Sequence, residues 1–184
     1  MRRSLSFLFS IIALIAFLAS PPPAQAQQGP FDATVSVCFT PGGNCTDLIV
    51  RQLGALEKGG ELLVQAYSFT SAPIAQAVVQ AFQRGVDVRV ILDKSQRTEK
   101  YSGATYLANA GIPVVIDERP SIAHSKIMVL NRSLVIGGSF NFTAAAQQRN
   151  AENLVFMSSR ALAAAYVENW QSRWALSVPF AARS

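Results

Sequence analysis

The segment Ala123 to Asn141 (AHSKIMVLNRSLVIGGSFN) contains four side chains whose types and spacing suit chemistry on a phosphodiester. His124 is the only histidine of the chain, and Lys126 follows two residues later. Residues at this spacing in a β-strand have their side chains on the same face. Ser139 and Asn141 have the same spacing. Together they offer one nucleophile, one cation and two hydrogen-bonding groups for the non-bridging oxygens of a phosphate.

Two short apolar runs have to position these side chains. Ile127 to Leu130 and Leu134 to Ile136 are predicted as strands, and Asn131-Arg132 between them as a tight turn. A hairpin of this kind brings the residues before its first strand close to those after its second. Taken singly, a lone histidine, a lysine beside a strand and a Ser-x-Asn turn all have ordinary structural interpretations. Only their joint spacing indicates a site.

The spacing resembles the signature of the phospholipase D superfamily, which combines His-x-Lys, Asp, Gly-Ser and Asn. In this chain the signature positions are His124, Lys126, Asn131 in place of the usual Asp, Gly138, Ser139 and Asn141. The segments AYSFTSAPIAQAVVQAFQRGVDVRVILD, LANAGIPVVID, GSFNFTAAAQQRNAENLVFM and ENWQSRW are similar to the small, single-motif, Nuc-like bacterial endonucleases. The resemblance covers nearly all of the chain after about Ala33.

This resemblance implies covalent catalysis, in which His124 attacks phosphorus to give a phosphohistidine that water then hydrolyses. It implies that Lys126, Ser139 and Asn141 hold the phosphate oxygens in the transition state. Glu152, in the segment NAEN, is implied as the partner of the other imidazole nitrogen. Asn131 removes a carboxylate but lies near the turn, so we expect a structural role there and retained activity.

Other hydrolytic chemistries find no support in the sequence. A metal-assisted hydrolase needs a cluster of carboxylates or histidines, and a serine hydrolase needs a G-x-S-x-G elbow. Neither pattern is found, so we expect no metal and no cofactor. The leaving alkoxide still needs a general acid, and the chain has a single histidine. A two-fold homodimer would supply the second one, which predicts a composite active site at the subunit interface.

The first 26 residues have the pattern of a bacterial secretory signal peptide. Met1-Arg2-Arg3 precedes an apolar run from Leu5 to Ala19, and Ala24-Gln25-Ala26 offers a cleavage site. We therefore expect a periplasmic or secreted protein without stable membrane insertion after cleavage near Ala26. An uncleaved anchor is the alternative, although the run is shorter than a membrane span. Residues 27–184 then form one domain, which contains 14 basic and 11 acidic residues.

Two cysteines agree with export. Cys38 and Cys45 bracket the turn-forming sequence CFTPGGNC, and in an oxidising compartment they are expected to form a disulfide. A zinc site is the alternative. A zinc site would need further ligands, and the chain has only one histidine and no third cysteine to supply them.

Strand and helix patterns alternate along the chain, which predicts an α/β fold with a mixed β-sheet flanked by helices on both faces. The expected strands are 33–39, 61–69, 86–92, 112–116, the two strands of the hairpin, and 153–157. The expected helices are 46–58, one capped by Ser71 and ending at Gly85, a short one over 104–110, and 159–175. The tryptophans Trp170 and Trp174 in the last helix are interpreted as packing residues.

Three functions remain open at the level of sequence. The first is a metal-independent endonuclease, or another phosphodiesterase acting on nucleic acid. The second is a phospholipase D acting on phosphatidylcholine or cardiolipin, which would use the same catalytic residues. The third is a periplasmic binding module that has kept the fold without the activity, supported only by Asn131.

Overall fold

The structure is a computed structural model that describes residues 29–99 and 102–181. The expected signal peptide and its cleavage position lie outside these described residues. Among the helices of the described part, none has both the length and the apolar character needed to cross a membrane.

In chain order the elements are β1 (Thr34–Thr40), α1 (Cys45–Gly54), β2 (Glu61–Ala66), α2 (Ala72–Gln83), β3 (Asp87–Asp93), the 3-10 helix η1 (Lys94–Arg97), α3 (Ala104–Asn109), β4 (Val114–Asp117), β5 (Lys126–Leu130), β6 (Leu134–Gly138), α4 (Ala144–Gln148), β7 (Glu152–Ser158), α5 (Arg160–Leu176) and β8 (Val178–Pro179).

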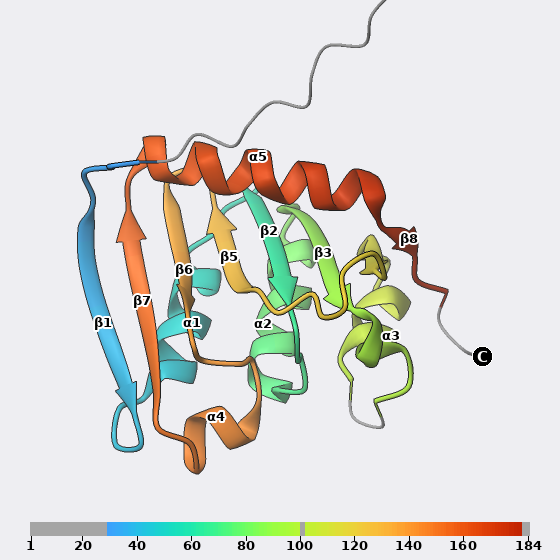
Figure 1. The fold of residues 1–184 in the computed structure, drawn as a ribbon, viewed down its shortest axis with the longest axis horizontal. Helices are drawn as coiled ribbons and strands as arrows, with labels where there is room; N and C mark the ends of the chain where they lie inside the picture. The colour runs from blue at the N-terminus through green and yellow to red at the C-terminus, as the bar shows by residue number, and fades with distance from the viewer. Residues whose placement is uncertain (1–28, 100–101, 182–184) are drawn as a thin grey trace, which may run out of the picture.

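One mixed sheet of eight strands, in the order β1-β7-β6-β5-β2-β3-β4-β8, forms the centre of the described chain (Figure 1). Strands β2, β3 and β4 are parallel to one another, and the other neighbours pair antiparallel. Helix α5 crosses one face of the sheet, whereas α1, α2 and α3 pack on the other. The expected mixed sheet with helices on both faces is therefore confirmed.

The central strands are apolar on both sides because helices cover both faces. Every residue of β5 is buried. Met128 packs into the core shared with α1, α2 and α3, and the next residue, Val129, packs into the core under α5. This explains why the hairpin strands appear in the sequence as continuous apolar runs rather than alternating ones.

Helix α5 buries a narrow stripe made of Ala163, Val167 and Trp170. The indole N–H of Trp170 donates a hydrogen bond of 2.9 Å to the carbonyl oxygen of Val64, so its polar atom is satisfied inside the core. Trp174 stacks on Trp170 with 4.9 Å between the ring centroids. The interpretation of the two tryptophans as packing residues is confirmed.

The first helix differs from the expected range 46–58. Its N-cap is Asn44 rather than Thr46, and it ends at Gly54. The Arg84 guanidinium donates hydrogen bonds to the carbonyl oxygens of Leu53 and Leu56, which satisfies acceptors at the end of the helix. The structure also adds three short elements that the sequence pattern did not predict, namely η1, α4 and β8.

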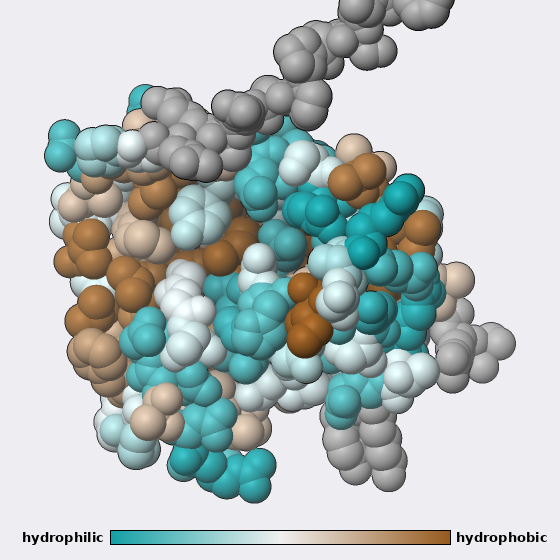
Figure 2. All heavy atoms as spheres, in the orientation of Figure 1, coloured by the Kyte–Doolittle hydropathy of each residue, from teal (hydrophilic) through white to brown (hydrophobic). Residues whose placement is uncertain are grey.

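The edge strand β1 carries both the disulfide and an exposed apolar surface. Cys38 and Cys45 are bonded, which confirms the expected bridge and links β1 to the start of α1. Val35, Val37 and Phe39 point to solvent, with 52–61% of each residue exposed. Figure 2 shows hydrophobic residues gathered on this side of the molecule.

Candidate active site

The β5–β6 hairpin has His124, Lys126, Ser139 and Asn141 at or near its open end, whereas Asn131 lies in its turn. Ile127 pairs with Gly137 and Leu130 with Leu134. Asn131 and Arg132 form the tight turn in left-handed conformation, with φ values of 49° and 50°. This turn confirms the prediction from the sequence.

His124 lies before the strand rather than in it. Strand β5 begins at Lys126, so the argument that two residues of one strand share a face does not apply to this pair. A hydrogen bond connects the two residues instead: the Lys126 ammonium donates to the backbone carbonyl oxygen of His124 at 2.7 Å. The imidazole itself is exposed at the surface.

Lys126 is a buried cation, with 6% of the residue exposed. Desolvation by burial lowers the pKa of its ammonium from the ordinary value of 10.5, and the negative charge of Glu152 opposes this shift. The ammonium nitrogen also lies 5.2 Å from the centre of the Tyr67 ring. A desolvated cation next to an exposed imidazole is suited to hold an anionic substrate group.

Tyr67 is a site residue that the sequence analysis did not single out. It follows β2, which ends at Ala66 rather than at the expected Phe69. Its ring centroid lies 4.6 Å from that of His124, and its N–H donates to the carbonyl oxygen of Ser125 at 2.9 Å. An aromatic residue directly after a buried central strand was the available signal in the sequence.

Ser139 and Glu152 are joined directly. The Ser139 hydroxyl donates to a carboxylate oxygen of Glu152 at 2.6 Å and accepts the backbone N–H of Asn153 at 3.0 Å. The side chain of Asn150 donates to the other carboxylate oxygen at 2.9 Å. Among the described residues no hydrogen bond joins Glu152 to His124, so within one chain the implied carboxylate–imidazole pair is not formed.

Asn141 contributes an unpaired acceptor. Its side-chain oxygen is buried and has no hydrogen-bond partner among the described residues. The next residue, Phe142, is held in place because its carbonyl oxygen accepts the N–H groups of Thr70 and Ser71, both at 2.9 Å. An unpaired buried acceptor is costly unless a donor pairs with it. Phosphate oxygens are acceptors too, so it is the NH₂ group of the same amide that can donate to a substrate phosphate.

Asn131 lies at the opposite end of the hairpin from the other signature residues. Its side-chain oxygen accepts the backbone N–H of Glu61, and its own N–H donates to the carbonyl oxygen of Glu61, both at 2.9 Å. The residue therefore connects the turn to the start of β2. The expected structural position of Asn131 is confirmed.

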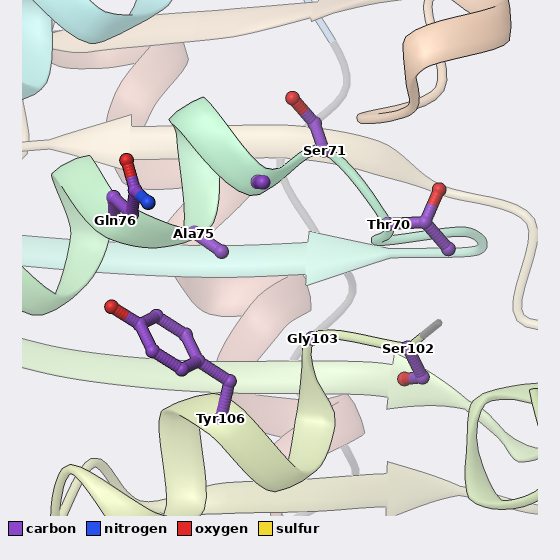
Figure 3. A pocket seen from close by; sticks show the side chains of 8 residues that line it. Thr70, Ser71, Ala75, Gln76, Ser102, Gly103 and Tyr106 are labelled. Carbon is purple, nitrogen blue, oxygen red and sulfur yellow. The ribbon is translucent and has the colours of Figure 1, made fainter. Parts of the chain in front are cut away.

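Four cavities of the described chain lie away from the His124 site. Figure 3 shows one of about 310 Å³ between α2 and α3, where Thr70, Gln76, Ser102 and Tyr106 are among the lining residues. Asn131 lines two of three others of about 180–460 Å³, but His124, Lys126, Ser139, Asn141 and Glu152 line none of them. The described residues also contain no group of three or more His, Cys, Asp and Glu side chains arranged to hold a metal ion.

A family model described as "Cardiolipin synthase, PLD-like domain" matches residues 55–174, which include every signature position. The chain belongs to the phospholipase D superfamily. As a member it is a hydrolase of the phosphodiesterase class.

Proteins with different names are similar to this chain in sequence or in structure. A phospholipase D of Rickettsia felis is 45% identical over 139 residues, covering 76% of this chain and 68% of that protein. A mitochondrial cardiolipin hydrolase of Xenopus tropicalis is 32% identical over 108 residues, covering 59% of this chain and 51% of that protein. The crystal structure of Nuc from Salmonella typhimurium superposes with a TM-score of 0.76 at 35% identity, covering 83% of this chain and all of that one.

Proposed function

We propose that this phosphodiesterase is an exported, metal-independent endonuclease that cleaves nucleic acid through a phosphohistidine at His124. The observation that carries the proposal is the pairing of an exposed imidazole with a buried ammonium, joined through the 2.7 Å bond from Lys126 to the His124 carbonyl. The side-chain amide of Asn141, whose oxygen has no partner among the described residues, and the Ser139 hydroxyl are the other polar groups of the site.

In the first step a ring nitrogen of His124 forms a bond to phosphorus while the bond to the leaving oxygen breaks. Lys126 and the amide of Asn141 stabilise the charge that builds on the non-bridging oxygens. In the second step the oxygen of a water molecule attacks phosphorus, the nitrogen–phosphorus bond breaks, and a phosphomonoester leaves. Glu152, oriented by Ser139 and Asn150, favours the charged form of the Lys126 ammonium against the effect of burial.

Each step also needs a proton carrier. The leaving oxygen must receive a proton in the first step, and the attacking water must lose one in the second. We assign both transfers to the His124 imidazole of a second subunit, because the chain has one histidine. The exposed position of His124 is compatible with such an approach. The active species is then a two-fold homodimer with one composite site.

The exposure of two site residues favours nucleic acid as the substrate. His124 and Ser139 are both exposed, and the cavities described above lie elsewhere. An extended polymer can cross such a surface, whereas a small headgroup is usually bound in a concave pocket. The match to the entire chain of Nuc supports the same choice.

Phospholipid is the second candidate substrate. Its support is the 45% identity to the Rickettsia phospholipase D together with Ile122, two residues before His124, of which 54% is exposed. An apolar side chain beside the nucleophile could contact acyl chains at a lipid surface. The binding-module alternative loses its argument because Asn131 lies away from the signature residues.

The proposed export rests on the sequence of residues 1–26 and agrees with the disulfide. Disulfides persist in the periplasm and outside the cell, where thiols are not kept reduced. The bond between Cys38 and Cys45 therefore supports a periplasmic or secreted location.

The test is to incubate the mature protein and its His124→Ala variant with plasmid DNA and with phosphatidylcholine–cardiolipin vesicles, all in excess EDTA. The proposal expects DNA cleavage that disappears in the variant and weakens as salt screens the phosphate contacts. Headgroup release without DNA cleavage would favour the second candidate. Full activity of the variant, or a requirement for a divalent ion, would contradict the proposed chemistry.

A further inference from the structure

The nucleophile proposed above lies in a segment that no helix or strand holds. Residues 118–125 connect β4 to β5 and have no regular structure. In Figure 1 this segment passes across the ends of β2 and β3. Other contacts must therefore fix the position of His124.

Asp93, the last residue of β3, contacts the residue directly before His124. One carboxylate oxygen accepts the backbone N–H of Ala123 at 2.7 Å, and the other accepts that of Ser95 at 2.9 Å. Only 3% of Asp93 and 5% of Ala123 are exposed. The carboxylate therefore joins the end of a core strand to the residue directly before His124.

The same stretch of chain holds the segment at two further points. The Lys94 ammonium donates to the carbonyl oxygen of Pro120 at 3.2 Å, and the Arg97 guanidinium pairs with Glu118 at 2.7 Å. Both of these contacts are at least partly exposed and are weak contributors in water. The bond from Ala123 to Asp93 is the buried one, and a charged acceptor makes it stronger than a neutral bond.

On its other side His124 is held by the contacts of the catalytic residues. Lys126 donates to the carbonyl oxygen of His124, and the N–H of Tyr67 donates to that of Ser125. The backbone of the nucleophile is thus fixed at the preceding N–H by Asp93 and at its own carbonyl by Lys126. Removal of the bond to Asp93 leaves only the partly exposed contacts of Lys94 and Arg97 to hold the segment before His124.

We propose that Asp93 is a positioning residue for the reaction, which holds the His124 imidazole in line with the phosphate through the backbone of Ala123. This inference rests on the proposed nucleophilic role of His124. Asp93 does not touch substrate, because both of its oxygens face backbone N–H groups inside the protein. Burial raises the pKa of Asp93, but the bonds from Ser95 and Ala123 outweigh it, so the pKa lies below its ordinary value of 3.8.

Asp93→Asn tests the proposal, since an amide has one acceptor oxygen and its NH₂ group would face an N–H. The variant is compared with Asp87→Asn, which removes an exposed carboxylate from the other end of β3. On bis(4-nitrophenyl) phosphate in EDTA we expect kcat of Asp93→Asn to fall about 10- to 100-fold, since small misplacements of reacting groups cost about this much. KM should change less than threefold, and Asp87→Asn should match the wild type.

The single histidine allows a second readout. The Tyr67 ring, whose centroid lies 4.6 Å from that of His124, should shift the NMR signals of the imidazole. In Asp93→Asn these signals should move toward the values of a free imidazole while the rest of the spectrum remains that of a folded protein. Ala123→Pro, which removes the N–H and leaves the bond to Ser95, should give the same loss of kcat. In the wild type, the Ala123 amide should exchange slowly with solvent although it lies outside the helices and strands.

Three results would overturn the proposal: wild-type kcat in folded Asp93→Asn or Ala123→Pro, a loss explained entirely by the unfolded fraction, or fast exchange of the Ala123 amide in the wild type. The exchange measurement decides the question even where neither variant folds. Full activity of His124→Ala would instead refute the proposed nucleophile, and the exchange and NMR results would still show whether Asp93 fixes this segment.

Discussion

Lys126 sets the electrostatics of the site because it is the buried cation beside the imidazole. Its ammonium must be protonated to stabilise negative charge on phosphate. Desolvation lowers the pKa of this ammonium, so activity should be lost at a lower pH than for an ordinary lysine. Glu152 favours the charged form and so moves the loss of activity back toward higher pH.

The pH profile of kcat/KM tests this account. The alkaline decrease should lie below pH 10.5, the ordinary lysine value. In Glu152→Gln it should move to lower pH, since the neutral amide no longer attracts the ammonium. Glu57→Gln, which changes an exposed carboxylate after α1, should leave the profile unchanged. An alkaline decrease that stays in place or rises in Glu152→Gln would show that another group titrates.

Asn131 is the one signature position that differs from the superfamily pattern. The structure makes it a turn residue, with φ of 49° and two bonds to Glu61. Asp tolerates this left-handed conformation almost as well as Asn. We expect Asn131→Asp to change kcat/KM by less than about threefold, as surface substitutions away from a site usually do. A gain of orders of magnitude in a steady-state assay would place this residue in the catalytic machinery.

At the scale of elements, the existence of the longer strands and helices followed from local patterns, but the short η1, α4 and β8 and the ends of elements did not. The apolar runs of β5 and β6 and the turn between them are local and were predictable. The end of α1 is bonded by Arg84, about 30 residues away, and the segment just before β5 is held by the bond from Ala123 to Asp93. Such contacts between distant residues are not visible in any window of the sequence.

The link between β1 and α1 gives a prediction about stability. The Cys38–Cys45 bridge closes a short loop, so Cys38→Ser/Cys45→Ser should lower the free energy of unfolding by about 2–3 kcal/mol. Activity at 25 °C should remain, because neither cysteine contacts the site residues. Urea titration measures the first quantity, and wild type treated with reductant is the control. Loss of activity in a folded variant would mean that the bridge also supports the site.

At the scale of the whole molecule, helices on both faces were predictable from strand–helix alternation, whereas the strand order was not. Pairing of β1 with β7 brings together residues more than a hundred positions apart. The signature indicated which side chains form the site. It did not reveal that the Ser139 hydroxyl donates to the carboxylate of Glu152, or that the Tyr67 ring packs beside the His124 ring. These contacts arise only when β2, β5, β6 and β7 lie side by side.

The composite site predicts a dominant effect between subunits. If each reaction needs two histidines, a dimer of one wild-type and one His124→Ala subunit is inactive. Activity per wild-type subunit should therefore fall as excess variant is exchanged into the dimers, and sedimentation should show a dimer throughout. Mixing without time for exchange is the control. Unchanged activity after full exchange, or an active monomer, would contradict the shared site.

The central claim is a covalent bond between His124 and phosphorus, and rapid quenching tests it most directly. Wild-type protein mixed with a short nucleic-acid substrate in EDTA, quenched in alkali within the first turnover and analysed by mass spectrometry should carry, on the peptide that contains His124, the phosphoryl group still esterified to the retained part of the substrate. The adduct should be labile in acid and absent from His124→Ala. Turnover without any such adduct at any quench time, or an adduct on another residue, would contradict the account.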